Sequence, residues 1–419
     1  MSPFGDRAQT PAIEGLASRG VAFSDAVTVI PKTAQSVASF LTGRYPVNHG
    51  VRDLYDNLSP SQPNLARAFQ AAGYSTAALV NNPWISRAHG FGHGFDRYYG
   101  TDEVKWGFRS GRRFVIWDVL YDRAVRQRLE WQPRPREGVF EARASELTDA
   151  AIAVLRSQRQ PFFLYVHYFQ PHWPYFPPPD LQERYHAPPP EKSVVNFIED
   201  SPWGLKQMIF ENPLPEEENE GARRLYQGEV DDTMAEVGRL LEALDDSRWG
   251  DDTIVVFTAD HGHSLGEHDY HFHHGAFLYD ATVRIPLILS WPGHLPEGRT
   301  GEAQVRSIDV APTLTELASV EIEGPLDGRS LSGFWAGDAE GPREAFVESD
   351  IRMMKSNRRR EVGGVLGKLR AWRTGPQKLI LTPALAGPRL ELFDLVADPE
   401  ELQDLSGEES HQPDVAAHR

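Results

Sequence analysis

The chain contains no cysteine among its 419 residues, and this absence removes several kinds of chemistry. Disulfide bonds, thiolate zinc fingers, iron–sulfur centres and thiol nucleophiles all need cysteine side chains, so none of them occurs here. Basic residues are scarce relative to acidic ones, with 43 Lys and Arg against 60 Asp and Glu and a formal charge of −17. A general nucleic-acid-binding protein needs a basic face, so we expect no nucleic acid among the partners.

Long apolar runs are also missing. No stretch of about 18 apolar residues occurs, so the sequence predicts no transmembrane helix. Residues 1–20 lack the basic-then-apolar order of a signal peptide. As written, the chain is therefore expected to be soluble and cytoplasmic. Its oligomeric state is not encoded in any pattern that we recognise.

Short apolar strands alternate with amphipathic helices, a pattern that predicts an α/β fold with a mostly parallel sheet and helices on both faces. The clearest segments are expected strands at 75–80, 161–168, 252–260 and 283–291, and expected helices beginning at residues 11 and 33. After about residue 340 short strands dominate, which indicates a small antiparallel C-terminal subdomain. We therefore predict a catalytic domain over 1–339 and a subdomain over 340–419.

A long helix is predicted around residues 222–244, because apolar residues recur there at steps of three and four. We interpret this stripe as core packing. Asp231 and Asp232 lie beside it and are expected to face solvent.

The richest segment is Thr258–Gly275, "TADHGHSLGEHDYHFHHG", which holds six histidines, two aspartates and one glutamate. Neutral imidazole and carboxylate are the usual ligands of zinc- and manganese-type ions. Asp260 and His261 follow an expected strand, and ligands gather at the carboxyl ends of strands in open α/β sheets. The segment therefore predicts a metal site, the alternative being a surface loop that has collected histidine without a function.

Several segments, taken together and in order, resemble the sulfatase family of the alkaline phosphatase superfamily. They are "TADHGHSLGEH" followed by "LYDATVRIPLILSWPG", "ASFLTGRYPVNHGVR", "LYVHYFQPHWPYFPP", "SIDVAPTLTELASV" with "LDGRSL", and "ELFDLVADPEELQDLS". The resemblance covers most of the chain. It implies the alkaline phosphatase/sulfatase fold and a metal-dependent hydrolase that cleaves a sulfate or phosphate-type ester of a small molecule, glycan or lipid.

The resemblance also implies roles for individual residues. Asp260 and His261 become metal ligands, and Thr33 falls at the position of the nucleophile. His172 would contact or protonate the leaving oxygen, and His274 would grip the ester oxygens.

Thr33 stands at an expected helix N-terminus, where free N–H groups and the helix dipole favour an anion. A simple N-cap role is the alternative for Thr33, and Ser36, one turn further on, is the second candidate nucleophile. The cofactor is expected to be a divalent ion. With a histidine ligand we favour zinc or manganese over calcium, which prefers oxygen ligands, and over magnesium.

The sequence departs from the family at three places. Residues 33–37 read "TAQSV" where typical sulfatases have C/S-x-P-x-R, and threonine cannot become formylglycine. Thr33 would instead form a covalent ester that water must cleave, as in phosphatases of the superfamily. The G-K-W-H-L-G segment is missing, and Asn82 or Arg87 would replace its anion-gripping residues poorly.

The third departure is at the N-terminus, where the family has an apolar strand ending in metal-binding aspartates. Asp6 follows no strand and is a poor replacement, so we expect the missing strand to be encoded upstream of Met1. Two rival functions stay open. One is a phosphoryl-group transferase of the same superfamily, and the other is a binding protein that has lost part of its metal site.

Overall fold

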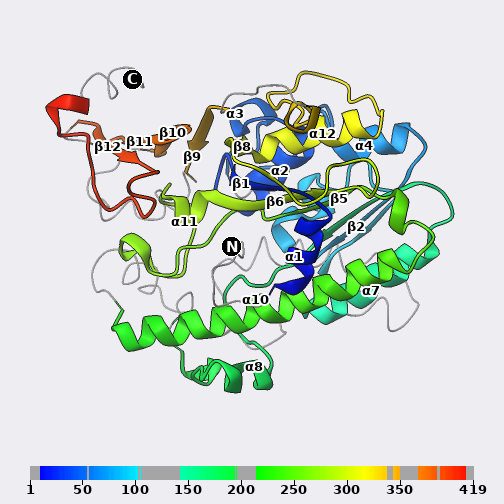
Figure 1. Ribbon diagram of the computed structural model, residues 1–419, viewed down its shortest axis with the longest axis horizontal. Helices are drawn as coiled ribbons and strands as arrows, with labels where there is room; N and C mark the ends of the chain where they lie inside the picture. The colour runs from blue at the N-terminus through cyan, green and yellow to red at the C-terminus, as the bar shows by residue number, and fades with distance from the viewer. Residues whose placement is uncertain are drawn as a thin grey trace. The chain divides into compact units, whose positions relative to one another are not determined.

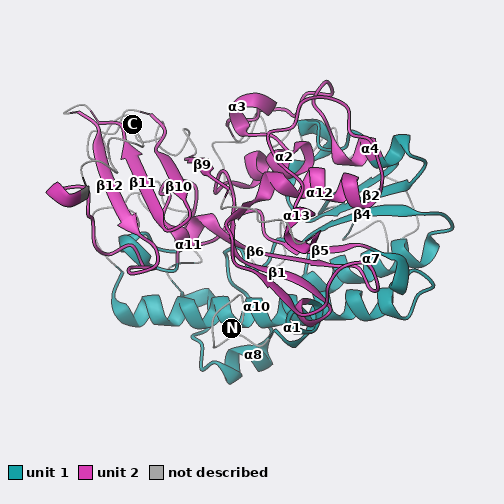
Figure 2. Ribbon diagram, turned by 45° about the horizontal axis from the view of Figure 1, so that its top comes forward, with its two compact units in different colours: residues 1–16, 69–253, 265–272 teal, residues 17–68, 254–264, 273–419 magenta. Residues whose placement is uncertain are grey.

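The computed structural model describes residues 10–53, 56–101, 104, 142–193, 195, 214–336, 343–349, 367–384 and 387–411. The chain divides into two compact units, which Figure 2 shows in different colours. Unit 1 consists of residues 1–16, 69–253 and 265–272, and unit 2 of residues 17–68, 254–264 and 273–419. Among the described helices, none is both long and apolar enough to span a membrane. Asp6 lies outside the described residues.

Unit 1 is built on a parallel three-stranded sheet in the order β3-β2-β4. Its strands are β2 (Ser75–Val80), β3 (Arg97–Tyr99) and β4 (Phe162–His167), and its longer helices are α7 (Ala144–Ser157), α8 (Pro179–Arg184) and α10 (Glu216–Asp245). Most of α1 (Pro11–Ser18) and the end of α4 (Leu65–Ala71) also belong to it. Short 3₁₀ turns complete the unit: η1 (Pro83–Ile85), η2 (Arg87–His89), η4 (Pro190–Lys192), η7 (Gly250–Asp252) and η8 (Glu267–Asp269).

Both faces of this sheet are covered by apolar side chains, because neighbouring strand residues point to opposite faces. Leu164 and Val166 pack in one cluster with apolar residues of α7. Phe163, the residue before Leu164, stacks on Phe69 and Phe95 with ring centroids 4.9 and 5.8 Å away. The alternation of β4 therefore builds a layer on each face, and the strands predicted at 75–80 and 161–168 are confirmed.

The long helix α10 runs beside α7 and α8 (Figure 1). Its apolar stripe is mostly buried as predicted, but the prediction that Asp231 faces solvent is wrong, and Asp232 is half-buried. Asp231 is buried and accepts hydrogen bonds from Tyr185 Oη at 2.6 Å and from Arg184 at 3.4 Å. Burial, with Glu236 nearby, raises the pKa of Asp232 to about 6. The apolar period of α10 does not reveal that its other side packs against α8 and the residue after it.

Unit 2 contains a mixed five-stranded sheet and an antiparallel four-stranded sheet. Its strands are β1 (Gly20–Val27), β5 (Val255–Thr258), β6 (Arg284–Ser290), β7 (Arg299–Gly301), β8 (Val305–Arg306), β9 (Ala345–Glu348), β10 (Arg370–Thr374), β11 (Gln377–Thr382) and β12 (Arg389–Asp394). Its helical elements are α2 (Thr33–Thr42), α3 (Pro46–His49), α11 (Asp280–Val283), η9 (Ser307–Asp309), α12 (Val310–Leu317), α13 (Gly333–Ala336) and η10 (Glu409–His411).

The strand β1 is the centre of the five-stranded sheet. It pairs in parallel with β7 and β8, while β6 runs antiparallel to both β1 and β5. The predicted α/β fold is confirmed, with the qualification that this sheet is mixed. The antiparallel sheet expected near the C-terminus is confirmed as β12-β11-β10-β9. The domain boundary at residue 339 stays a prediction.

The C-terminal sheet packs against the end of β1 and the segment that leads into β6. Val27, Leu278 and Val283 share one apolar cluster with residues of β9 to β12. A buried ion cluster stabilises the packing of the C-terminal sheet on this segment. In it, Lys378 Nζ lies 2.8 Å from Asp280 and 2.7 Å from Glu401. The sheet therefore supports the chain that follows the histidine-rich segment.

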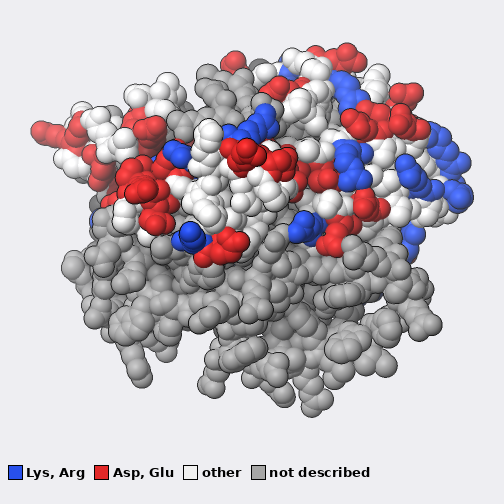
Figure 3. Space-filling view, turned by 90° about the horizontal axis from the view of Figure 1, so that it is seen from below, with Lys and Arg blue, Asp and Glu red and all other residues white. Residues whose placement is uncertain are grey.

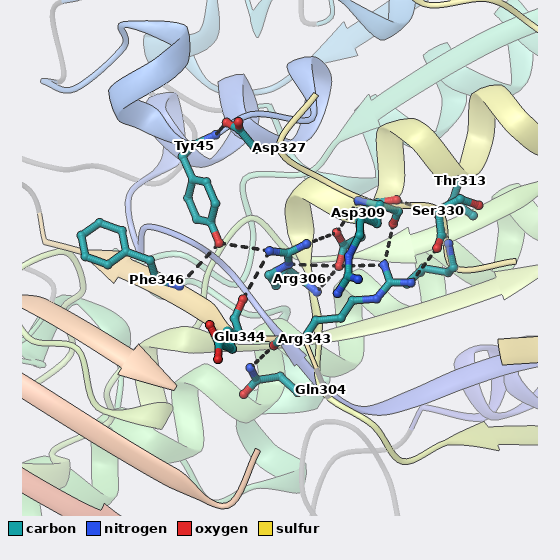
Figure 4. A network of polar contacts seen from close by, with 12 residues as sticks. Tyr45, Gln304, Arg306, Asp309, Thr313, Asp327, Ser330, Arg343, Glu344 and Phe346 are labelled. Carbon is teal, nitrogen blue, oxygen red and sulfur yellow. Dashed lines mark hydrogen bonds and ion pairs between the residues drawn. The ribbon is translucent and has the colours of Figure 1, made fainter. Parts of the chain in front are cut away.

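A second buried ion network lies around η9 (Figure 4). Asp309 accepts a 2.8 Å hydrogen bond from Arg306 and forms a 3.3 Å ion pair with Arg343. Arg306 also donates to Tyr45 Oη at 3.2 Å. Because α2 ends only three residues before Tyr45, the network anchors the C-terminal end of that helix. The two segments "LTGRYP" and "SIDVAPTL", both part of the family resemblance, thus meet in one supporting structure.

The turn after α2 contains a buried histidine. Gly43 caps α2 in the left-handed conformation at φ 64°, where a glycine has no Cβ to clash. His49 then packs back on the helix, with Nε2 2.9 Å from Ser39 Oγ and with Nδ1 accepting from the Val51 N–H at 3.1 Å. Both nitrogens of the neutral His49 ring therefore have hydrogen-bond partners.

His49 predicts a pH-dependent stability. Burial, with Arg44 nearby, lowers the pKa of His49 to about 3, whereas the unfolded chain protonates this ring below its ordinary pKa of 6.5. The unfolding free energy should therefore fall as the pH drops from 6.5 towards 3, by about 1.4 kcal/mol per pH unit from this group. Urea unfolding at about pH 7 and about pH 5 should show a smaller pH difference for His49→Gln than for the native protein. Equal pH differences in the two proteins would contradict this expectation.

Acidic and basic side chains are interspersed over the described residues of the face shown in Figure 3. This distribution agrees with the acidic composition. Over those residues, that face does not offer the continuous basic surface that a nucleic-acid-binding protein uses.

Candidate functional site

The candidate site begins at the first residue of α2. Thr33 is buried, with 6 % of its surface exposed, and Lys32 before it provides no side-chain cap. Thr33 Oγ1 lies 3.2 Å from His261 Nε2, although 228 residues separate the two in sequence. The structure thus brings the predicted nucleophile next to a predicted metal ligand.

Asp260 and His261 lie in the turn that follows β5. The His261 N–H donates to Asp260 Oδ1 at 3.0 Å, which directs the other carboxylate oxygen, Oδ2, to within 3.4 Å of His261 Nε2. The next residue must be glycine, because a Cβ on Gly262 would lie 2.3 Å from the carbonyl oxygen of Ala281. The turn is therefore packed closely against the start of β6.

The hydrogen bonding of His261 assigns its tautomer. Nδ1 lies 2.8 Å from the carbonyl oxygen of Gly262, and since a carbonyl only accepts, Nδ1 carries the proton. The lone pair of a neutral ring then lies on Nε2, the atom that faces Thr33 and Asp260. A histidine that ligates a metal usually donates its other N–H to a carbonyl or carboxylate in this way.

His274 completes the group from the other end of the histidine-rich segment. Its ring stacks on that of His261, with centroids 3.9 Å apart and an interplanar angle of 23°. His274 Nδ1 donates to the carbonyl oxygen of Pro31 at 3.1 Å, just before α2 begins. The Ser264 N–H donates to the carbonyl oxygen of His273 at 3.1 Å and so holds the two ends of the loop together. Thr33, Asp260, His261 and His274 therefore lie together in unit 2.

The donor atoms match part of the shell of a divalent ion. A tetrahedral ion with bonds of about 2.0–2.1 Å keeps neighbouring donors about 3.3–3.4 Å apart. The separations from His261 Nε2 to Asp260 Oδ2 and to Thr33 Oγ1 are 3.4 and 3.2 Å. Within the described part of the chain, no group of three or more His, Asp or Glu gathers around one point. The two separations from His261 Nε2 thus fit two ligands and a hydroxyl around one divalent ion.

The remaining candidates lie in unit 1. His172 follows β4 and donates from Nδ1 to the carbonyl oxygen of Trp173 at 2.6 Å, so its role at the ester stays a prediction. Asn82 accepts from the Trp84 N–H at 3.0 Å, and Arg87 donates to the carbonyl oxygen of Tyr98 at 3.4 Å. These two side chains contribute to local structure.

Sequence reasoning missed two contacts that shape the site. Ser36 Oγ donates to the carbonyl oxygen of Asp260 at 2.5 Å, and His274 bonds the carbonyl oxygen of Pro31. Each joins a side chain to a backbone atom more than 200 residues away. Such a contact leaves no periodic or spacing signal in a sequence.

Comparison with known proteins identifies the family. A family model described as "Sulfatase" matches residues 1–320, and one described as "N-sulphoglucosamine sulphohydrolase, C-terminal" matches residues 266–418. The chain is 27% identical to an ulvan-active sulfatase of Formosa agariphila over 95% of this chain and 72% of that protein. It is 28% identical to a choline-sulfatase of Rhizobium meliloti over 96% of this chain and 78% of that protein.

A solved structure shows the same fold. The phosphonate monoester hydrolase of Agrobacterium radiobacter superimposes with a TM-score of 0.75, covering 99% of this chain and 90% of its own, at 22% identity. At that identity the likeness concerns the fold alone.

Proposed function

The chain belongs to the sulfatase family and is a hydrolase of ester bonds, and we propose that it cleaves a sulfate or phosphate-type ester with Thr33 as nucleophile and a divalent metal ion as cofactor. The observation that carries the proposal is the 3.2 Å approach of Thr33 Oγ1 to His261 Nε2. That nitrogen carries the ring's lone pair, and Asp260 Oδ2 lies 3.4 Å from it. The Thr33 hydroxyl and two side chains of the types that bind metal ions therefore lie close together at the start of α2.

The proposed reaction has two steps. Thr33 Oγ1 gives its proton to solvent and attacks the sulfur or phosphorus of the ester. The bond to the alcohol oxygen breaks as the new bond forms, and the alcohol leaves after taking a proton from solvent. Water then cleaves the threonine ester, which releases sulfate or phosphate and restores the hydroxyl. The start of α2 favours the negative charge of the transferred group, because its backbone N–H groups and dipole point at the ligand.

Asp260 and His261 are the residues that would hold the metal ion. When bound there, a divalent ion supplies positive charge that lowers the pKa of a coordinated hydroxyl. Zinc or manganese suits a site with an imidazole ligand better than calcium or magnesium does. His274, whose ring is oriented by the Pro31 carbonyl, is proposed to bind the ester oxygens. The relatives named as sulfatases support a small-molecule or glycan ester as substrate.

Phosphate or phosphonate esters should turn over faster than sulfate esters with the same aryl leaving group. A formylglycine hydrate can expel sulfate by collapsing to its aldehyde, but a threonine ester must be cleaved by water at the trapped group itself. In-line displacement at a clamped phosphoryl group suits that second step. We would measure kcat/KM for matched aryl phosphate, aryl phosphonate and aryl sulfate substrates with zinc or manganese present. Thr33→Ala, assayed with each substrate, corrects for contaminating activity. Faster turnover of the aryl sulfate would refute this preference.

A further inference from the structure

Ser36 is the second hydroxyl of α2 that faces the histidine-rich turn. It lies three residues after Thr33, so both side chains stand on the same side of the helix. Ser36 is 1 % exposed, and its Oγ lies 2.5 Å from the carbonyl oxygen of Asp260. This is a short hydrogen bond for two oxygens. Thr33 thus meets the side chain of His261, while Ser36 meets the backbone of the residue before it.

The protons of this contact can be assigned from chemistry alone. A carbonyl has no proton, so Ser36 donates its single hydroxyl proton to Asp260. Thr28 Oγ1 lies 2.9 Å from Ser36 Oγ, and it must therefore donate to Ser36. Thr28 Oγ1 also lies 3.1 Å from the carbonyl oxygen of Ile30, so its proton is shared between two acceptors. The result is a buried chain of hydroxyls that runs from Thr28 through Ser36 to the Asp260 carbonyl.

That carbonyl belongs to the peptide group that joins Asp260 to His261. Its oxygen is held by Ser36, and its N–H donates to Asp260 Oδ1 at 3.0 Å. A peptide group is planar, so fixing both of its polar atoms fixes its orientation. The orientation of this one plane sets where Asp260 Oδ2 and the His261 ring stand relative to Thr33.

We propose that Ser36, held by Thr28, is a positioning residue that orients the Asp260–His261 peptide and so aligns both side chains with Thr33. Its importance for activity rests on the proposed function. Ser36 is then not the nucleophile, because its proton is donated to a carbonyl and its oxygen accepts from Thr28. Removing the hydroxyl of residue 36 leaves the peptide free to tilt, whereas threonine at the same position keeps the hydroxyl and its hydrogen bond.

The first test measures positioning without using activity. Hydrogen exchange of the amides in residues 259–262 should speed up in Ser36→Ala and, to a smaller degree, in Thr28→Val. Ser36→Thr, which keeps a hydroxyl, should retain the native protection. The matched control is Ser39→Ala, which removes another buried hydroxyl of α2 that bonds His49 instead of the turn. Native exchange of residues 259–262 in Ser36→Ala, or equal acceleration in Ser39→Ala, would overturn the proposal.

The second test concerns Mn²⁺ or Zn²⁺ binding, measured by calorimetry, together with kcat and KM. Ser36→Ala should weaken metal binding by about 10- to 100-fold, the range for residues that orient ligands, and should lower kcat more than it changes KM. Ser36→Thr should restore both, and Ser39→Ala should change neither. A native protein that binds neither ion contradicts the proposed function, whereas native binding that Ser36→Ala leaves unaltered contradicts the role of Ser36 alone.

Discussion

Replacing Thr33 by alanine should lower kcat by at least about 10³-fold, because a reaction that passes through a covalent ester cannot start without its nucleophile. The fold should persist, since the contact made by the Thr33 hydroxyl is with His261 Nε2 and not within the core. Serine at the same position should retain part of the activity. It keeps the hydroxyl, but without the methyl group the side chain loses its rotamer restriction and is aimed less well.

A matched control lies on the same helix. Thr42 is also buried, and its hydroxyl donates to the carbonyl oxygen of Ala38 at 2.7 Å, entirely within α2. Thr42→Ala makes the same chemical change nine residues away and should leave turnover close to native. Rapid acid quenching during turnover, followed by mass spectrometry of the peptide that contains Thr33, should detect the covalent ester. Full activity in Thr33→Ala would make a water nucleophile the better explanation.

The helices and strands were predictable because the spacing of apolar residues and the length of each apolar run are local features of the sequence. The strand at 75–80 is a short apolar run, and the helix beginning at residue 33 ends at a glycine that adopts the left-handed cap. The direction of β6 was not predictable. An apolar strand has the same composition in either direction, and only the path of the chain makes β6 antiparallel to β1.

The site was predictable to the extent that chemistry is visible in residue types. The aspartate and histidine after β5 were recognisable as candidate ligands, and the resemblance singled out Thr33, which the structure places 3.2 Å from His261. The contacts that hold them were hidden, because Ser36 and His274 bond to backbone carbonyls, which every residue has. The burial of Asp231 was hidden for a related reason. Its partner Tyr185 directly follows α8, and the packing of α8 against α10 has no counterpart in the apolar period of α10 itself.

Metal removal should have an effect comparable to loss of the nucleophile. We expect that the native protein contains zinc or manganese, and that a chelator lowers kcat by at least about 10²-fold in a way that the added ion reverses. His261→Ala and Asp260→Asn should each show the same loss and a lower metal content. The reason is geometric, since His261 Nε2 is the donor common to both short separations at the site, 3.4 Å to Asp260 and 3.2 Å to Thr33.

Asp260→Asn is the sharper of these two variants because it keeps the shape of the side chain. The amide retains an oxygen that can accept from the His261 N–H, so the turn should stay folded. The substitution removes only the negative charge that the carboxylate would present to the ion. The control is His294→Ala, which removes an imidazole from an exposed loop and should keep both metal and activity. Elemental analysis that finds only calcium, or an unchanged metal content in His261→Ala, would refute this assignment. The imidazole lone pair would then act on the Thr33 proton directly, because the tautomer fixed by the Gly262 carbonyl leaves Nε2 as an acceptor in either case.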